Sequence, residues 1–302
     1  MNEEPLVSVV LCTFNDEQFI ANSIQSILGQ SYKNFEFIIW NDGSTDNTEQ
    51  IVNSFKDERI RYFFHENTGL GGALKLACEK ARGKYIARMD GDDICVPNRL
   101  QKEVAYLEKH PNYVLVSGQM TYIDEDDRSY GMTFICGPDY IVRKRLPYGS
   151  TICHPGSMFR KSSYDECGGY EALRFMEDHL FFQRLLKAGK VHILTDVVIQ
   201  YRVRKGSLIQ SNINNPYSDL LASFRNKMLN DDVVSSDDVE LYNQLYLYSK
   251  NHLSSNGHIT KRKTKTAQER IYTFLKPIFG KDLSRKIVIS TKNLIYYVKC
   301  TL

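Results

Sequence analysis

The chain has 302 residues, of which 42% are hydrophobic and 25% are charged, and its formal net charge is +3. These are ordinary values for a soluble globular protein, and the length allows one large domain or a domain with an appendage. No apolar run approaches the ~18 uncharged residues of a membrane-spanning helix, so no transmembrane helix is predicted.

Basic and acidic residues are unevenly distributed along the chain. Residues 261–302 contain eleven Lys or Arg and two acids, which leaves 28 basic and 34 acidic residues in 1–260. A basic tail on an acidic body suggests an anionic partner surface near the C-terminus. The seven cysteines form no C-x-x-C pair, and the N-terminus lacks the basic start of a signal peptide. We therefore expect reduced thiols in a cytoplasmic protein.

Apolar, β-branched runs alternate with helical patterns over the first third of the chain. The predicted strands cover 6–14, 35–42, 60–66, 84–90 and 113–118. The first predicted helix begins after an N-cap at Asn15. Further helices are predicted over 48–55, after the Gly-rich turn within 67–83, and over 97–110. Such alternation predicts an α/β fold with a Rossmann-like, mostly parallel central sheet and helices on both faces.

The regular alternation ends near residue 120. A short strand, a short helix and a Gly turn are predicted in 157–170, followed by a helix over 175–189. Two further strands are predicted at 191–194 and 197–203, and 215–260 has a mostly helical pattern.

Polar residues follow the predicted strands where ligands bind in open parallel sheets, beyond the carboxyl ends. Thr13 and Asn15 end the first strand, Asp42 ends the second, and the stretch "DGDD" from Asp90 to Asp93 ends the fourth. Carboxylates in a D-x-D turn can hold Mg²⁺ or Mn²⁺ together with substrate phosphates. The same turn could also be an acidic surface turn.

Other motifs have equally plain alternatives. Glu177 and Asp178 open a helix, where acids suit the helix dipole, and one of them could serve as a general base. His154 lies on a turn before a proline and could contact a substrate or be a polar turn residue. The stretch "NTGLGG" at 67–72 matches neither common phosphate-binding motif and is read as a tight turn.

The order of these motifs resembles the inverting family-2 glycosyltransferases of the GT-A fold. The motifs are "VSVVLCTFNDEQFIANSIQSILGQSYKNFEFIIWNDGSTDNT", "ENTGLGGAL", "ARGKYIARMDGDD", "HPGSMFRKSSYDECGGY" and "MEDHLFFQRLLKAG". The resemblance covers about residues 6–205. It implies a nucleotide-sugar donor, usually a UDP-sugar, and a divalent metal, Mn²⁺ or Mg²⁺.

The resemblance also implies a role for each matching residue. Thr13 and Asn15 would edge the nucleotide pocket, Asp42 would read the base, Asp90 would meet the ribose, and Asp92 would hold the metal and diphosphate. On the other side of the cleft, Asp178 would be the catalytic base, with Glu177 and His154 on the acceptor side. Asp93 would support the loop.

Two departures from the family pattern stand out. Many relatives carry Arg-Asn after the Gly-rich turn, where this chain has Leu74-Lys75, so Lys75 is the candidate basic contact to the diphosphate. Relatives often end the core with "YR-x-H", whereas "YRVRK" places Arg204 at the histidine position. Arg202 and Arg204 are therefore candidate diphosphate contacts.

We expect a GT-A domain over 1–210, divided into a nucleotide-binding half (1–118) and an acceptor half (119–210), and a helical, basic extension over 211–302. The expected reaction moves a sugar onto a glycan or lipid-linked acceptor in cell-surface polysaccharide biosynthesis. A basic amphipathic helix at 281–302 would contact an anionic membrane, or pack on the body; a nucleic-acid partner is not expected. We thus expect a cytoplasmic protein, peripheral on the inner face of the plasma membrane.

Two other functions compete with this expectation. One is a metal-dependent nucleotidyltransferase or phosphohydrolase that uses the same acidic turn, although "DGDDI" lacks the D-x-D-x-T pattern of an aspartyl nucleophile. The other is a catalytically inactive module that binds a nucleotide-sugar.

Overall fold

The computed structural model describes residues 4–133, 138–146, 151–204 and a few helical residues between 236 and 247. The strands are β1 (Val7–Thr13), β2 (Phe35–Asn41), β3 (Ile60–Phe64), β4 (Tyr85–Asp90), β5 (Ile94–Cys95), β6 (Tyr113–Ile123), β7 (Ser129–Met132), β8 (Met158–Arg160) and β9 (Lys190–Arg202). The helices are α1 (Ile20–Leu28), α2 (Thr48–Ser54), α3 (Leu70–Glu79), α4 (Arg99–Lys109), α5 (Asp139–Arg145), α6 (Lys161–Glu166) and α7 (Glu177–Leu185).

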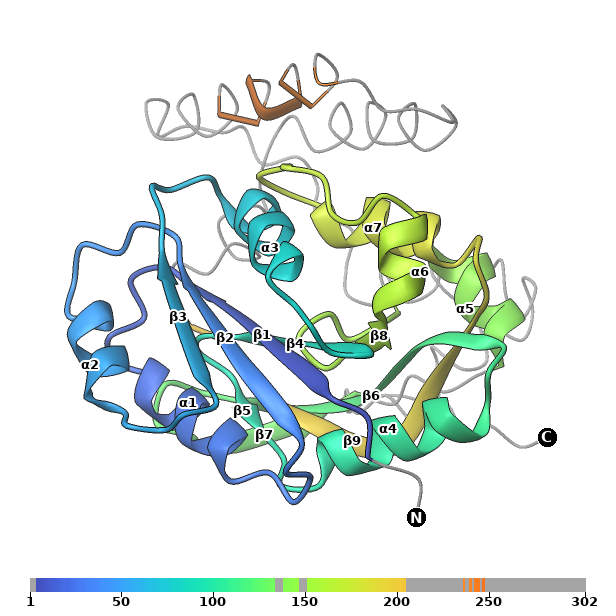
Figure 1. Cartoon of the computed structure of the whole chain (residues 1–302), viewed down its shortest axis with the longest axis horizontal. Helices are drawn as coiled ribbons and strands as arrows, with labels where there is room; N and C mark the ends of the chain where they lie inside the picture. The colour runs from blue at the N-terminus through green and yellow to red at the C-terminus, as the bar shows by residue number, and fades with distance from the viewer. Residues whose placement is uncertain are drawn as a thin grey trace, which may run out of the picture.

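The strands form one sheet in the order β3-β2-β1-β4-β8-β6-β9-β5, with β7 paired to β6 (Figure 1). β3, β2, β1 and β4 are mutually parallel, β8 is antiparallel to both β4 and β6, and β6 and β9 are parallel. The expected mostly parallel central sheet is confirmed. Because β1, β2 and β4 are neighbours, their carboxyl ends meet at one edge.

Helices cover both faces of this sheet, as predicted (Figure 1). Successive strand residues face opposite sides, so Val9 and Leu11 pack in one buried cluster with α1, α2 and α4. Val10 and Cys12 pack in a second cluster with α3, α5, α6 and α7. Both faces of β1 are therefore dry, which explains its continuous apolar sequence.

Several local predictions were wrong. Asn15 does not cap α1, whose N-cap is Phe19; Asn15 instead adopts a left-handed backbone with φ 56°. The two strands expected at 191–194 and 197–203 are one strand, β9, which bends past β6 through register shifts. β6 runs across the expected division at 118/119, so the two halves share this strand.

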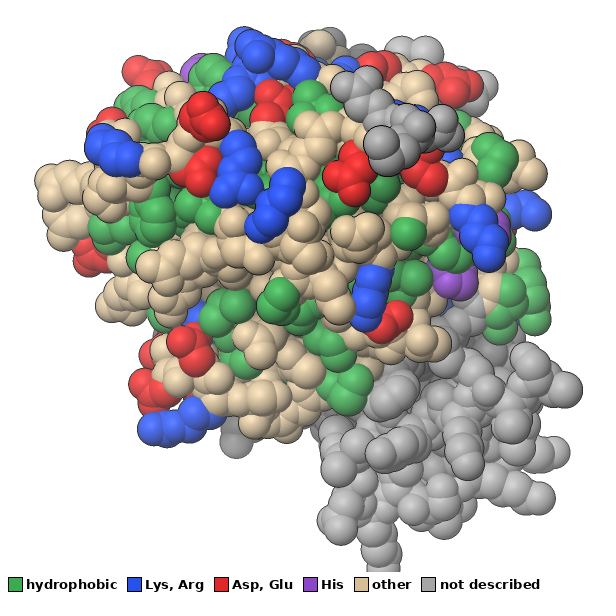
Figure 2. All heavy atoms as spheres, turned by 60° about the horizontal axis from the view of Figure 1, so that its bottom comes forward, with side chains coloured by type: hydrophobic (Ala, Val, Ile, Leu, Met, Phe, Trp, Pro, Cys, Tyr) green, Lys and Arg blue, Asp and Glu red, His purple; other side chains and the backbone are tan. Residues whose placement is uncertain are grey.

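The surface that carries α1 and α4 has interspersed acidic and basic side chains (Figure 2). No helix in the described part of the chain is long and apolar enough to cross a bilayer. The basic tail, the amphipathic helix expected at 281–302 and most of the helical extension lie outside the described residues.

Candidate active site

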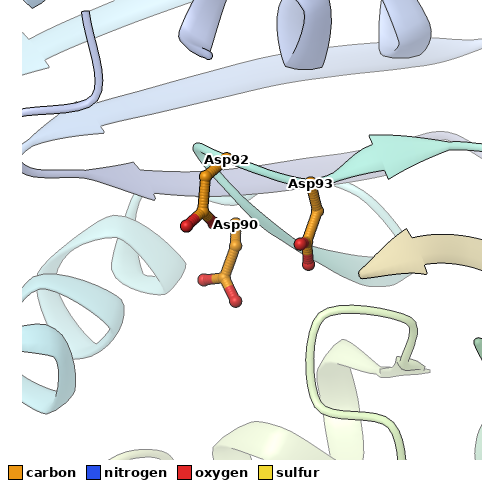
Figure 3. A group of neighbouring side chains, drawn as sticks. All are labelled: Asp90, Asp92 and Asp93. Carbon is orange, nitrogen blue, oxygen red and sulfur yellow. The ribbon is translucent and has the colours of Figure 1, made fainter. Parts of the chain in front are cut away.

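The acidic turn directly follows β4 at the carboxyl edge of the sheet. Asp90 pairs in register with Cys12 of β1, and Gly91 then lets the chain turn. A side chain at Gly91 would lie 2.6 Å from the Asp16 carboxylate and 2.9 Å from the Thr13 hydroxyl. Carboxylate oxygens of Asp90, Asp92 and Asp93 lie within 4.8 Å of one another and project to the same side of the turn (Figure 3).

The three carboxylates have different partners. Asp90 forms an ion pair at 2.5 Å with the buried Arg88, two residues earlier on β4. Asp92 Oδ2 accepts a hydrogen bond from Arg204 Nε at 2.7 Å. Asp93 is fully buried, and its Oδ1 accepts the backbone N–H of Arg202 at 2.8 Å. Asp93 thus ties the turn to β9, which agrees with the expected loop-supporting role.

Asp16 belongs to this cluster although its sequence context gave no sign of it. Arg204 Nη2 donates to Asp16 Oδ1 at 2.5 Å, and Asp16 Oδ2 accepts from the Thr13 hydroxyl at 2.8 Å. Burial raises the pKa of Asp16 to about 7, and the charge of Asp92 acts in the same direction. Arg204 therefore bridges Asp16 and Asp92 across the turn.

Arg202 has a different position from Arg204. Its side chain is 1% exposed, donates to the Asp92 backbone carbonyl at 2.7 Å and to the Asp124 carbonyl at 2.6 Å, and pairs with Asp127. The guanidinium also lies over the Phe19 ring, 4.5 Å from its centroid. This geometry fits a structural support of the turn and disfavours the expected diphosphate contact at Arg202.

The expected base-reading residue, Asp42, organises the Gly-rich turn that precedes α3. Its Oδ1 accepts the Thr68 N–H and hydroxyl, each at 2.9 Å, and its Oδ2 accepts the Gly69 N–H at 2.9 Å. Burial raises the pKa of Asp42. Two carboxylate oxygens offer about four acceptor sites, so the contacts leave capacity for a donor from a ligand.

The other residues expected on the donor side are Asn15, Thr13 and Lys75. Asn15 Oδ1 accepts the Thr45 N–H at 2.8 Å, which links the ends of β1 and β2. Thr13 is 3% exposed and is bound to Asp16. Lys75 is half-buried on α3, whereas Leu74, at the position of the family's arginine, is fully buried in the core.

The two carboxylates expected on the acceptor side open α7. Met176, the N-cap, has a left-handed backbone with φ 63°, and Glu177 and Asp178 follow in the first turn. His179 Nδ1 lies 3.2 Å from Asp178 Oδ1. His154 Nε2 lies 2.8 Å from the Tyr170 hydroxyl, and its Nδ1 lies 3.9 Å from Glu177 Oε1.

The two neighbouring carboxyl groups differ in protonation. Burial and the adjacent charge of Asp178 raise the pKa of Glu177. Burial also opposes ionisation of Asp178, but the hydrogen bond and charge from His179 outweigh it and hold the pKa of Asp178 below its usual range. Burial and the charge of Arg88 lower the pKa of His154 well below 6.5. The pKa values of the two neighbouring carboxyl groups are thus shifted in opposite directions.

Arg88 connects the two sides of the site and was missed at the sequence level. Its charge acts on Asp90, Glu177 and His154, and its side chain is 2% exposed. The missed signal was a single arginine inside a buried strand, two positions before a carboxylate on the same face. An unpaired charge in such a place would be very costly.

The acidic turn fits a divalent cation. Asp90 and Asp92 present hard oxygen ligands at the carboxyl edge of the sheet with side-chain exposures of 24% and 19%, which suits Mg²⁺ or Mn²⁺. Arg204 engages one oxygen of Asp92, and the second oxygen forms no hydrogen bond within the described part of the chain. Asp93 is fully buried, and its Oδ1 is bound to the β9 backbone, whereas its Oδ2 has no hydrogen-bond partner among the described residues.

A sheet with carboxylates at its carboxyl edge, facing a helix that opens with two acids, is the arrangement of a GT-A glycosyltransferase. The family model described as Glycosyl transferase family 2 matches residues 8–168. The glycosyltransferase EpsE of Bacillus subtilis (strain 168) is 36% identical over 215 residues, which are 68% of this chain and 76% of EpsE. The chain belongs to glycosyltransferase family 2, as the motifs predicted.

Solved structures support the same fold. TarS 1-349 of S. aureus in complex with UDP-GlcNAc has a TM-score of 0.62 and 20% identity, covering 89% of this chain and 80% of that one. The mannosyltransferase PcManGT of Pyrobaculum calidifontis, in complex with GDP-Man and Mn²⁺, has a TM-score of 0.58 and 18% identity, with coverages of 85% and 77%.

Proposed function

We propose that this glycosyltransferase moves a sugar from a UDP-sugar to a hydroxyl of a glycan or lipid-linked acceptor, with inversion at the anomeric carbon. The observation that carries the proposal is the pair Glu177 and Asp178, whose pKa values move in opposite directions beside the acidic turn. Two carboxyl groups with pKa values separated in this way support the assignment of one of them as the base. The UDP-GlcNAc and GDP-Man complexes of TarS and PcManGT support a nucleotide-sugar donor.

In the proposed mechanism Asp178 accepts the proton of the acceptor hydroxyl. The lowered pKa of Asp178 favours its carboxylate form, which is the form that can accept a proton. The protonated Glu177 adds no second negative charge beside it and can donate a hydrogen bond to the acceptor. Displacement from the face opposite the nucleotide passes through an oxocarbenium-like transition state.

On the donor side, Asp42 would accept the N–H of the base and Asp90 would accept a ribose hydroxyl, while Thr13 and Asn15 shape the edge of the pocket. A divalent cation held by Asp92 would act as a Lewis acid toward the diphosphate.

Arg204 adds a fixed positive charge beside Asp92. Arginine binds phosphate oxygens in a bidentate manner, so Arg204 is our proposed diphosphate contact at the position of the family's histidine. Lys75 on α3 is the second candidate.

The rival functions are less well supported. A phosphohydrolase needs an aspartyl nucleophile with access to phosphorus, and "DGDDI" lacks the threonine of the D-x-D-x-T pattern. An inactive binding module would not need one ionised and one protonated carboxyl group at the start of α7. The cellular setting that we propose is the cytoplasmic face of the membrane in surface-polysaccharide synthesis, with residues 281–302 as the membrane contact.

Calorimetric titration of UDP with and without Mn²⁺ tests the donor and metal assignments. We expect UDP to bind more tightly with Mn²⁺, and Asp92→Ala to abolish this difference. Asp126→Ala, in an exposed carboxylate of the hairpin before β7, is the matched control and should leave it unchanged. UDP binding that is indifferent to Mn²⁺ in the unmodified protein would refute the metal site.

A further inference from the structure

The segment 171–176, here called the strap, leads directly into Glu177 and Asp178. On one side it contacts the Gly-rich turn that Asp42 organises. Gly71 N–H donates to the Leu173 carbonyl at 3.2 Å, and Arg174 Nη1 donates to Asn67 Oδ1 at 3.4 Å. A Cβ at Gly71 would lie 2.3 Å from the Leu173 carbonyl oxygen, so this approach depends on glycine.

On its other side the strap is held by helical residues from the C-terminal part of the chain (orange in Figure 1). Asn243 makes two backbone contacts, donating to the Ala172 carbonyl at 2.8 Å and accepting the Arg174 N–H at 2.9 Å. The Tyr242 hydroxyl donates to the Phe175 carbonyl at 2.9 Å. These three bonds involve backbone groups of Ala172, Arg174 and Phe175, so they fix the path of the strap backbone.

Apolar contacts reinforce these hydrogen bonds. Tyr242 and Tyr246 join Leu173 and Leu180 in a separate buried cluster. The Tyr246 ring stacks on Phe175 with centroids 5.7 Å apart. Tyr242 and Tyr246 are four positions apart and therefore lie on one helix face.

The backbone at the end of the strap needs such support. Met176 has a left-handed conformation, which costs on the order of 1–3 kcal/mol for a residue other than glycine and persists only when its surroundings enforce it. This conformation sets the direction in which α7 starts and hence where Glu177 and Asp178 lie. Contacts that fix the strap thus also fix the carboxyl pair.

We propose that Asn243 and Tyr242 are positioning residues for the transfer reaction: they clamp the strap and thereby hold Asp178 toward the donor. The proposal rests on the proposed function of Asp178, but the clamp itself is a property of the fold. Small displacements of a catalytic group can cost about 100-fold in rate, so loosening the strap should lower kcat more than it weakens donor binding.

The test compares Asn243→Ala with Gln244→Ala in the full chain. Gln244 is on the same helix, and within the described residues its side chain hydrogen-bonds to Glu240, at 2.9 Å, and not to the strap, so its variant is the matched control. We expect Asn243→Ala to increase deuterium exchange in 171–178 and to lower kcat about 10-fold or more, with the donor KM and the UDP affinity little changed. Asn243→Asp keeps the acceptor for Arg174 N–H and should recover part of kcat.

Unchanged exchange in 171–178, or unchanged kcat in Asn243→Ala, would overturn the clamp, as would a kcat for Asn243→Asp no higher than that of Asn243→Ala. Failure of the proposed function gives a different result. In that case the unmodified protein turns over no nucleotide-sugar, whereas the exchange comparison still reports on the strap.

Discussion

The proposed donor side and the proposed acceptor side of the candidate site are built in different ways. On the donor side, Thr13, Asp42 and Asp90 end or follow three neighbouring parallel strands, so the sheet brings them together. On the acceptor side, the carboxyl pair of α7 depends on the strap, on His154 and on residues near 243, which are far apart in sequence. The order of the strands is enough to bring the donor-side residues together, whereas the positions of the acceptor-side residues depend on tertiary contacts between distant segments.

Removing the proposed base should produce the largest effect. Asp178→Asn keeps the size of the side chain but cannot accept a proton, so we expect transfer to fall about 100- to 10,000-fold, the usual range for a general base. UDP affinity, a donor-side property, should not change. The control is Asp165→Asn, an exposed carboxylate on α6. Steady-state transfer and calorimetry measure the two effects, and unchanged transfer would exclude Asp178 as the base.

The connection between the two sides can be broken at Arg88. Arg88→Met leaves Asp90 without its buried partner, and breaking one half of a buried ion pair typically costs about 3–5 kcal/mol. Lys161→Met removes a more exposed pair with Asp165 and should cost about 0.3–0.5 kcal/mol. Urea unfolding compares the free energies. If Arg88→Met is no less stable than Lys161→Met, the buried pair does not support the turn.

The contact between the Gly-rich turn and the strap can be tested at Gly71. Because a Cβ there meets backbone oxygens of Leu173 and Glu171 at 2.3 and 2.6 Å, Gly71→Ala should cost about 1–3 kcal/mol as an overpacked site and lower kcat. Gly131→Ala, whose nearest neighbour would be 3.7 Å away, is the control. Thermal unfolding and transfer assays would contradict the contact if the two variants behaved alike.

The smallest expected effect is a shift in the pH dependence of transfer. His179 holds the pKa of Asp178 low, so the base should stay ionised to acidic pH. His179→Phe removes this influence and leaves burial, which raises the pKa of Asp178. The acid limb of the kcat/KM profile should then move to higher pH. His192→Phe, at a ring that stacks on Tyr106 away from the site, should not move it.

The sequence was sufficient for the parallel half of the fold, whereas the roles of the expected donor-side residues stay predictions. Buried strands such as β1 and β4 are continuous apolar runs, and the polar residues at their ends identify the ligand edge. The antiparallel strand β8 has only three residues, too few for a periodic pattern to reveal its direction.

Pairings between distant residues could not be predicted in the same way. Asp16 meets Arg204 across 188 positions, and the strap meets Asn243 through backbone groups that leave no pattern in the sequence. Arg202 and Arg204 looked equivalent in "YRVRK", and only their burial and partners separate a structural arginine from one at the cleft.

The proposed function requires that the protein breaks the bond between the anomeric carbon of the sugar and the diphosphate. Incubation of the unmodified protein with a panel of nucleotide-sugars and Mn²⁺, followed by NMR of the products, tests it directly. We predict release of the nucleoside diphosphate, with the sugar transferred to the acceptor or to water in the inverted anomeric configuration. Release of a nucleoside monophosphate with a sugar phosphate, or a retained configuration, would contradict the account.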